Sequence, residues 1–223
     1  MTHELRLYKD DLEPGALMPV GRDETSVTAI YIVTGSLRLR SESLETDFAA
    51  NTACCVHEAA EMSAGSSPTL ALRWELAVAG TAPSAEPAPG VSTKSLLTAP
   101  LSLDSGKTYL LRCDRVDFPP GGVAYLHTHQ GGGIRCLLAG SIEIETKGAR
   151  HSFGPLEAWF EAGPDPVFAT ASATEASAFV RLMILPRSLL GKSSIMYVNA
   201  ADLEKPKSQS YQVFIDTPFE LPT

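Results

Sequence analysis

Two histidines separated by one residue are the side chains best suited to chemistry in this chain. His127 and His129 belong to the stretch HTHQGGG, and the whole sequence has only five histidines. If this stretch is an extended strand, alternate side chains share a face, so the two imidazoles lie roughly 6 to 7 Å apart along it. Imidazole is a ligand of Fe, Ni, Cu, Zn and Mn. The pair is therefore predicted either to bind a divalent metal ion or to hold a small molecule through hydrogen bonds.

The two histidines do not complete a metal site, because such sites usually have three or four ligands. Glu161 and Glu157 are the carboxylates predicted to replace a missing ligand, and Gln130 lies directly after His129. The expected cofactor is a divalent ion (Fe, Ni, Mn or Zn) that is bound weakly or not at all.

Arg135 lies two residues after the glycine run, and strand alternation from Gly133 places it on the inward face. A buried guanidinium needs a partner. Two alternatives stay open: a bidentate contact with the carboxylate of a ligand, or an ion pair with a glutamate such as Glu161. Tyr125 and Trp159 are predicted to line the same pocket, with plain core packing as the alternative.

Short β-strands must position these side chains, because few segments show the apolar periodicity of a helix. Apolar or β-branched runs end at Gly, Pro, Asn or Asp, which is typical of an all-β sandwich or barrel. The expected strands include residues 27–33, 70–76, 109–112, 142–145, 179–185 and 211–215, with one helical turn near residues 199–204.

The chain reads as two copies of one domain. A constant offset of 105 residues places Gly140-Ser141 on Gly35-Ser36, and residues 81–105 open with an Ala/Pro/Gly-rich stretch typical of a linker. In this register His127 and His129 fall on Arg22 and Glu24. The copy in residues 1–80 therefore lacks the histidine pair and is predicted to be structural, while residues 106–223 carry the ligand site.

The stretch around the histidine pair resembles the first motif of the cupin superfamily, which reads Gly, five residues, His-x-His, three or four residues, Glu, six residues, Gly. Here Gly121 precedes the pair by five residues, Gly133 stands in the glutamate position, and Gly140 ends the motif. The glutamate of the first motif, one of the family's four usual metal ligands, is thus replaced by glycine.

The second cupin motif reads Gly, five residues, Pro-x-Gly, two residues, His, three residues, Asn, and it is matched by residues 154–166. Gly163 fits the central glycine, Glu161 takes the proline position and Pro166 takes the histidine position. The resemblance implies an all-β bicupin, two cupin-type jelly-roll barrels in one chain, with metal motifs that keep two of four usual ligands.

Two functions follow from this resemblance and these residues. The first is a non-catalytic protein that binds a small carboxylate-bearing metabolite in the second barrel. The alternative is a metal-dependent cupin enzyme, of dioxygenase, isomerase or lyase type, that acts on a small acid.

Charge and composition limit the partners. The net charge is −8 with a pI of about 5.1 and no basic cluster, so nucleic acid and anionic membranes are poor partners. No apolar run approaches the roughly 20 residues of a membrane helix, and the N-terminal residues lack a signal-peptide pattern. We expect a cytoplasmic protein that forms a homodimer through open sheet edges, with its four cysteines as free thiols.

Overall fold

The computed structural model describes residues 2–21, 26–43, 45–56, 58–85 and 88–222, which fall into two compact units. The first unit is Met1–Ser105 with Glu220–Thr223, and the second is Gly106–Phe219. Arg22 and Glu24, the expected counterparts of the histidine pair, lie outside the described residues. Among the residues that are described, no helix is long and apolar enough to cross a membrane.

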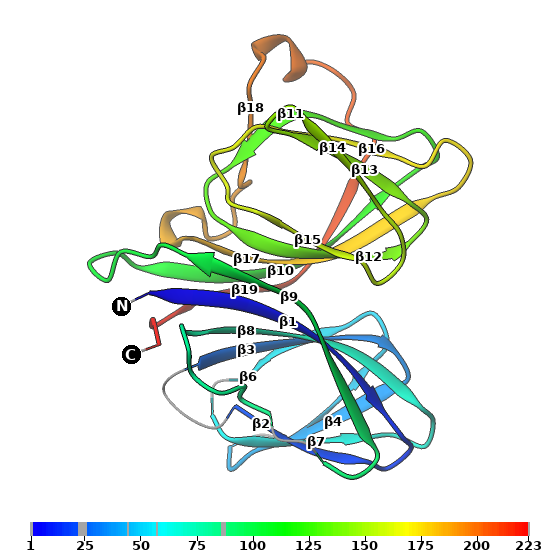
Figure 1. Cartoon of the computed structure of the whole chain (residues 1–223), viewed down its shortest axis with the longest axis vertical. Helices are drawn as coiled ribbons and strands as arrows, with labels where there is room; N and C mark the ends of the chain where they lie inside the picture. Colours follow the sequence, from blue (N-terminus) through cyan, green and yellow to red (C-terminus); the bar gives the residue numbers. More distant parts are fainter. Residues whose placement is uncertain (1, 22–25, 44, 57, 86–87, 223) are drawn as a thin grey trace. The chain divides into compact units, whose positions relative to one another are not determined.

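The first unit, drawn from blue to green in Figure 1, has two antiparallel sheets, one in the order β6-β3-β8-β1-β9 and one in the order β2-β7-β4-β5. Its strands are β1 (His3–Leu12), β2 (Leu17–Val20), β3 (Ser26–Thr34), β4 (Ser36–Arg40), β5 (Glu45–Ala49), β6 (Ala53–Val56), β7 (Ala60–Ala64), β8 (Thr69–Val78) and β9 (Val91–Leu101).

The second unit repeats this arrangement with the sheets β15-β12-β17-β10-β19 and β14-β13-β16-β11-β18 (Figure 1). Its elements are β10 (Tyr109–Phe118), β11 (Val123–His129), β12 (Gly133–Ala139), β13 (Ile142–Thr146), β14 (Ala149–Phe153), β15 (Ala158–Glu161), β16 (Val167–Ala171), β17 (Ser177–Pro186), the 3₁₀ turn η1 (Arg187–Leu189), β18 (Ile195–Tyr197), the 3₁₀ turn η2 (Ala200–Asp202) and β19 (Ser210–Phe219).

Side-chain alternation explains why these segments form sheets with one buried face. In β4, Leu37 and Leu39 are buried whereas Arg38 and Arg40 are exposed. The same alternation, with period two, buries one face of each sheet against the other sheet of its unit. The apolar and β-branched runs of the sequence are therefore strands, as predicted.

The internal repeat extends to the register of strand pairing. Arg135 of β12 lies opposite Trp159 of β15, and Ile30 of β3 lies opposite Cys54 of β6, which is the same pair moved by 105 residues. Gly35 and Gly140 both have positive φ, +79° and +70°, at the turn that follows β3 and β12. The glycines that repeat in the sequence thus mark equivalent turns in two equivalent sheets.

The expected linker over residues 81–105 is wrong in its second part. Residues 91–101 form β9, which pairs with β1 along its whole length and completes the first sheet. The Ala/Pro/Gly-rich composition describes only the connection before β9. Composition alone missed the strand because β9 is an edge strand with many exposed side chains, so it lacks a continuous apolar run.

The interiors of the two units differ. The apolar core cluster of the first unit includes Ile30 and Val56, the counterparts of Arg135 and Glu161. The core of the second unit is apolar around Trp159 and Phe179 but gives way to histidine, arginine and glutamate beyond them. The positions of Arg135 and Glu161 are therefore polar in the second unit and apolar in the first.

Candidate functional site

A β-bulge points both histidines into the second barrel. Ala124 faces the core, and strict alternation from it would turn His127 outward. The pairing of β11 with β16 shifts register between Ala124 and His127, which reverses the phase. His127 and His129 are consequently 5% and 3% exposed, with their Nε2 atoms 3.2 Å apart.

The protonation of the pair follows from its hydrogen bonds. The Nδ1 of His127 lies 2.7 Å from the carbonyl of Tyr125, which only accepts, so Nδ1 carries the proton and Nε2 is an acceptor. The Nε2 of His129 must then donate to it, and this same nitrogen lies 3.2 Å from Oε2 of Glu161. The pair is thus linked directly to the carboxylate.

Glu161 is held from three sides. Its Oε1 accepts a hydrogen bond of 2.8 Å from the indole Nε1 of Trp159. Its Oε2 lies 2.8 Å from Nη2 of Arg135, whose Nη1 donates to the Gly133 carbonyl at 2.6 Å. Arg135 has no exposed surface and Glu161 is 8% exposed. Of the two alternatives for Arg135, the ion pair with a glutamate is therefore the one observed.

Burial and charge set the ionisation of this cluster. Burial disfavours a charged Glu161, but Arg135, His129 and Trp159 outweigh it and hold the pKa of the carboxyl well below its usual range. Burial lowers the pKa of Arg135 to about 10, which still leaves it charged at neutral pH. Burial lowers the pKa of His127 and lowers that of His129 to about 3, so both imidazoles are neutral.

The glycine in the glutamate position of the first motif is required by close packing. A Cβ atom on Gly133 would lie 2.3 Å from the carbonyl oxygen of Leu182 on β17. A Cβ on Gly131 would meet the carbonyl of Ile184 at 2.0 Å. The backbone thus passes too close to β17 for any side chain, and position 133 has no room for a carboxylate ligand.

Several residues expected at the site lie elsewhere. Gln130 is exposed, and the Tyr125 ring packs against the ammonium groups of Lys205 and Lys207 at 4.8 and 5.5 Å. Neither residue lines the cavities next to the histidines. Glu157 is exposed and its Oε2 accepts from the backbone of Gly154. Of the expected ligand-binding residues, the structure gathers Arg135, Trp159 and Glu161 around the histidine pair.

As they stand, these residues do not fit a divalent metal ion. Oε1 of Glu161 accepts a hydrogen bond from Trp159, and the charge of the carboxylate is already balanced by Arg135, whose Nη2 lies 2.8 Å from Oε2. The Nδ1 of His129 has no hydrogen-bond partner among the described residues, whereas a metal-bound histidine usually has its second nitrogen tied. Within the described parts of the chain, no group of three or more His, Cys, Asp and Glu is placed to hold an ion. The space beside the pair is about 20 Å³, enough for one water molecule.

A larger cavity of about 450 Å³, which the sequence did not indicate, lies in the same unit. Arg181, Ile195 and Tyr211 line both this cavity and the small space beside the histidines, so the two adjoin. Tyr197 also lines the larger cavity, and it lies opposite His127 in the pairing of β11 with β18. The complete lining is Arg112, Asp114, Arg181, Gly191, Lys192, Ser193, Ser194, Ile195, Tyr197, Lys207, Gln209, Tyr211, Val213 and Asp216.

The charged side chains of this cavity leave an excess of positive charge. Asp114 binds Arg181 through Nε and Nη2 at 2.6 and 3.0 Å, and Asp216 binds Arg112 at 2.9 and 3.0 Å. Lys192 and Lys207 add two charges that no carboxylate of the lining matches. An excess of positive charge in a chain of net charge −8 favours an anionic ligand.

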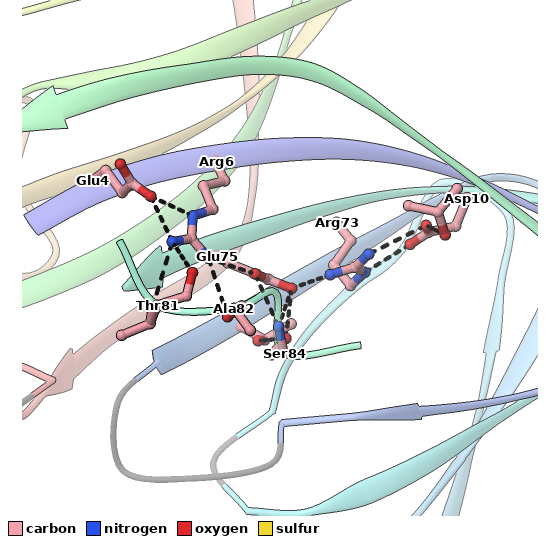
Figure 2. A network of polar contacts seen from close by, with 10 residues as sticks. Glu4, Arg6, Asp10, Arg73, Glu75, Thr81, Ala82 and Ser84 are labelled. Atoms are coloured by element: carbon pink, nitrogen blue, oxygen red, sulfur yellow. Dashed lines mark hydrogen bonds and ion pairs between the residues drawn. The ribbon is translucent and has the colours of Figure 1, made fainter. Parts of the chain in front are cut away.

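In the first unit, a buried polar network binds the start of the connection between β8 and β9 to the sheet, and Figure 2 shows this network. Arg6 donates to the carbonyls of Thr81 and Ala82 at 2.7 and 3.2 Å. The Ser84 hydroxyl donates to Glu75 at 2.5 Å, and Glu75 also pairs with Arg73.

The far end of this network is equally closed. Arg73 binds Asp10 at 2.7 Å, and its guanidinium lies 4.5 Å from the centre of the Tyr8 ring. Asp10 and Glu75 have no exposed surface. Residues 81–84, at the start of the connection between β8 and β9, are thus bound to the sheet. In the second unit, residues 187–209, between β17 and β19, instead form a wall of the cavity.

Comparison with known proteins identifies the fold. No family model matches the sequence, and no curated protein does so either. The crystal structure of AerE from Microcystis aeruginosa is 14% identical, covers 80% of this chain and 87% of its own, and gives a TM-score of 0.60. Two structures of oxalate decarboxylase OxdC from Bacillus subtilis, an enzyme with Mn(II) centres, are 11% and 10% identical with TM-scores of 0.66 and 0.63. Each covers 90% of this chain and 73% of its own.

Identities this low establish a shared architecture and leave the chemistry to the site itself. The matches extend over most of this chain and over both units, and they agree with the repeated sheet order. The predicted fold is confirmed: the chain is all-β and consists of two cupin-type jelly-roll barrels.

Proposed function

We propose that the second unit binds a small molecule carrying a carboxylate, in the 450 Å³ cavity that adjoins the histidine pair. The observation that carries the proposal is the excess of positive charge in a cavity of ligand size. Arg135, the arginine first expected to bind the carboxylate, is committed to Glu161. The role passes to Arg181 and Lys192.

Arg181 is well placed for this role. It is 4% exposed and uses Nε and Nη2 for Asp114, so Nη1, which has no partner among the described residues, is left for a ligand. The exposed Lys192 offers a second, flexible charge at the rim. Ile195, Tyr211 and Val213 supply apolar surface for the body of the ligand. This combination of a few polar groups and an apolar wall is common to small-molecule sites.

Calorimetric titration of the full chain with small mono- and dicarboxylates tests the proposal, with the matching amides as ligand controls. Lys192→Ala should weaken binding roughly tenfold, because a charge-assisted hydrogen bond contributes about 1.5 kcal/mol. Lys107→Ala, which removes a lysine of the same unit outside the cavity lining, should leave binding unchanged. If no carboxylate binds more tightly than its amide, the proposal fails.

The alternative function is a metal-dependent enzyme acting on a small acid. It is favoured by one observation: Nε2 of His127, Nε2 of His129 and Oε2 of Glu161, three atoms of types that ligate metals, follow one another at 3.2 Å. One equivalent of metal in the purified protein, lost when both histidines are replaced by alanine, would support it. A cytoplasmic location and a homodimer remain part of the proposal, the latter to be tested by light scattering.

A further inference from the structure

The electrostatic balance of the histidine cluster leaves no place for a second cation. Glu161 carries one negative charge and Arg135 one positive charge, 2.8 Å apart and both almost fully buried. Adding a divalent ion would place two more positive charges beside a guanidinium that cannot move into water. At the low effective dielectric constant of a barrel interior, repulsion between close like charges is strong.

The ligand set offers no way to offset this repulsion. Position 133 cannot carry a carboxylate, because a Cβ there would lie 2.3 Å from the Leu182 carbonyl oxygen. Pro166, in the position of the third histidine, has no side-chain donor. Glu161 is therefore the one carboxylate that contacts the pair among the described residues, and Arg135 already holds it.

We propose that the guanidinium of Arg135 is the resident cation of this site, and that it excludes a divalent metal ion from His127, His129 and Glu161. Arg135 does so in two ways: it neutralises the carboxylate, and its Nη2 occupies one side of Oε2. The charge of the carboxylate is balanced without a metal, because Trp159 donates to Oε1 and the guanidinium of Arg135 lies 2.8 Å from Oε2.

Loss of the Arg135 charge should appear as a measurable gain of metal binding. Replacing Arg135 by methionine keeps a long apolar side chain, removes the charge and frees Oε2 of Glu161. Two imidazoles and one carboxylate then remain, a set that binds divalent ions with water in the open positions. Metal binding should therefore appear in the variant and be absent from the natural protein.

The test is equilibrium dialysis of the full, untagged chain against Co²⁺ and Zn²⁺, with metal quantified by mass spectrometry and Co²⁺ also by its visible spectrum. The natural protein should retain no more metal than its His127→Ala/His129→Ala variant. Arg135→Met should retain about one equivalent, with the Co²⁺ absorption of a site of low coordination number. Adding Glu161→Gln to Arg135→Met should remove that metal, and Arg135→Lys, which keeps the charge, should bind none.

One equivalent of metal in the natural protein that depends on the two histidines would overturn the proposal. So would a folded Arg135→Met chain that takes up no metal. If Arg135→Met folds poorly, dialysis still shows whether the natural protein binds metal. Recovery of the variant's fold on adding Co²⁺ then shows whether the variant binds metal. Carboxylate binding in the cavity of about 450 Å³, the outer cavity, is measured separately without metal, so either proposal can fail alone.

Discussion

Removing the charge of Arg135 alone is expected to destabilise the second barrel more than removing the charges of Arg135 and Glu161 together. Arg135→Met leaves a buried carboxylate without its cation, and Glu161→Gln leaves a buried guanidinium without its anion. Breaking one side of a buried pair costs about 3–5 kcal/mol. That is a large part of the roughly 5–15 kcal/mol by which a domain is usually stable.

The double variant Arg135→Met/Glu161→Gln should cost less than either single change, because no uncompensated charge remains. The glutamine keeps an oxygen for the indole of Trp159, which now donates to Glu161 at 2.8 Å. Urea unfolding followed by Trp159 fluorescence reports on the second unit, provided that the only other tryptophan, Trp74 of the first unit, is replaced by phenylalanine in all variants.

The pH dependence of the stability of Arg135→Met is an independent test of the buried pair. Arg135 helps to hold the folded-state pKa of Glu161 below its unfolded value, so the natural pair adds stability above about pH 4 that is lost as the pH falls. Without Arg135, burial raises that pKa above the unfolded value, and the penalty grows as the pH rises from about 4 to 7. Arg135→Met should therefore be closer to the natural stability at pH 5 than at pH 7. Additive single costs, or a penalty below about 1 kcal/mol, would refute the buried-pair interpretation.

Three further outcomes are expected. His129 has a folded-state pKa of about 3, well below its unfolded value. Stability should therefore fall as the pH drops from about 6.5 towards 3, by up to about 1.4 kcal/mol per pH unit for this residue. Thermal unfolding of His129→Asn should show a flatter dependence of stability on pH, and an unchanged dependence would contradict the assignment. Gly133→Ala should lower stability by about 1–3 kcal/mol or more, because its Cβ would meet backbone, whereas Gly154→Ala, with no atom nearer than 3.7 Å, should be nearly neutral; equal denaturant midpoints would count against the close approach of β12 and β17. In the first unit, Arg73→Met should cost about 3–5 kcal/mol, because it leaves the buried Asp10 without its cation; the loss is measured by Trp74 fluorescence. Arg38→Ala, which breaks an exposed pair, should leave the unfolding midpoint unchanged.

Much of the fold could be predicted from the sequence because its signals are local. Alternation with period two marks the strands, and glycines at residues 35 and 140 mark equivalent turns of a repeat. The same alternation, started at Gly133, turned Arg135 inward and brought Glu161 into reach as its partner. Local periodicity sufficed here because β12 and β15 pair without a bulge.

Elsewhere the local rule was not enough. A bulge in β11 reverses the alternation between Ala124 and His127, and it leaves the Tyr125 ring packed against two lysines. Strand β9 has mostly exposed side chains, so it is defined by its hydrogen-bonded partner β1 and carries no apolar run of its own. Both features depend on which strands pair and in what register, which the sequence of one strand does not contain.

By itself, the sequence determined the all-β class, the duplication, the histidine pair and the inward arginine, since each follows from residue type and short-range spacing. Only the tertiary structure decided that Arg135 is paired with Glu161 and is not free for a ligand. It also built the outer cavity, whose walls come from β10, β17, β19 and the connection over residues 187–209. These segments are distant in the chain, and their convergence is set by sheet order and by the packing of an irregular connection, which have no local signature in the sequence.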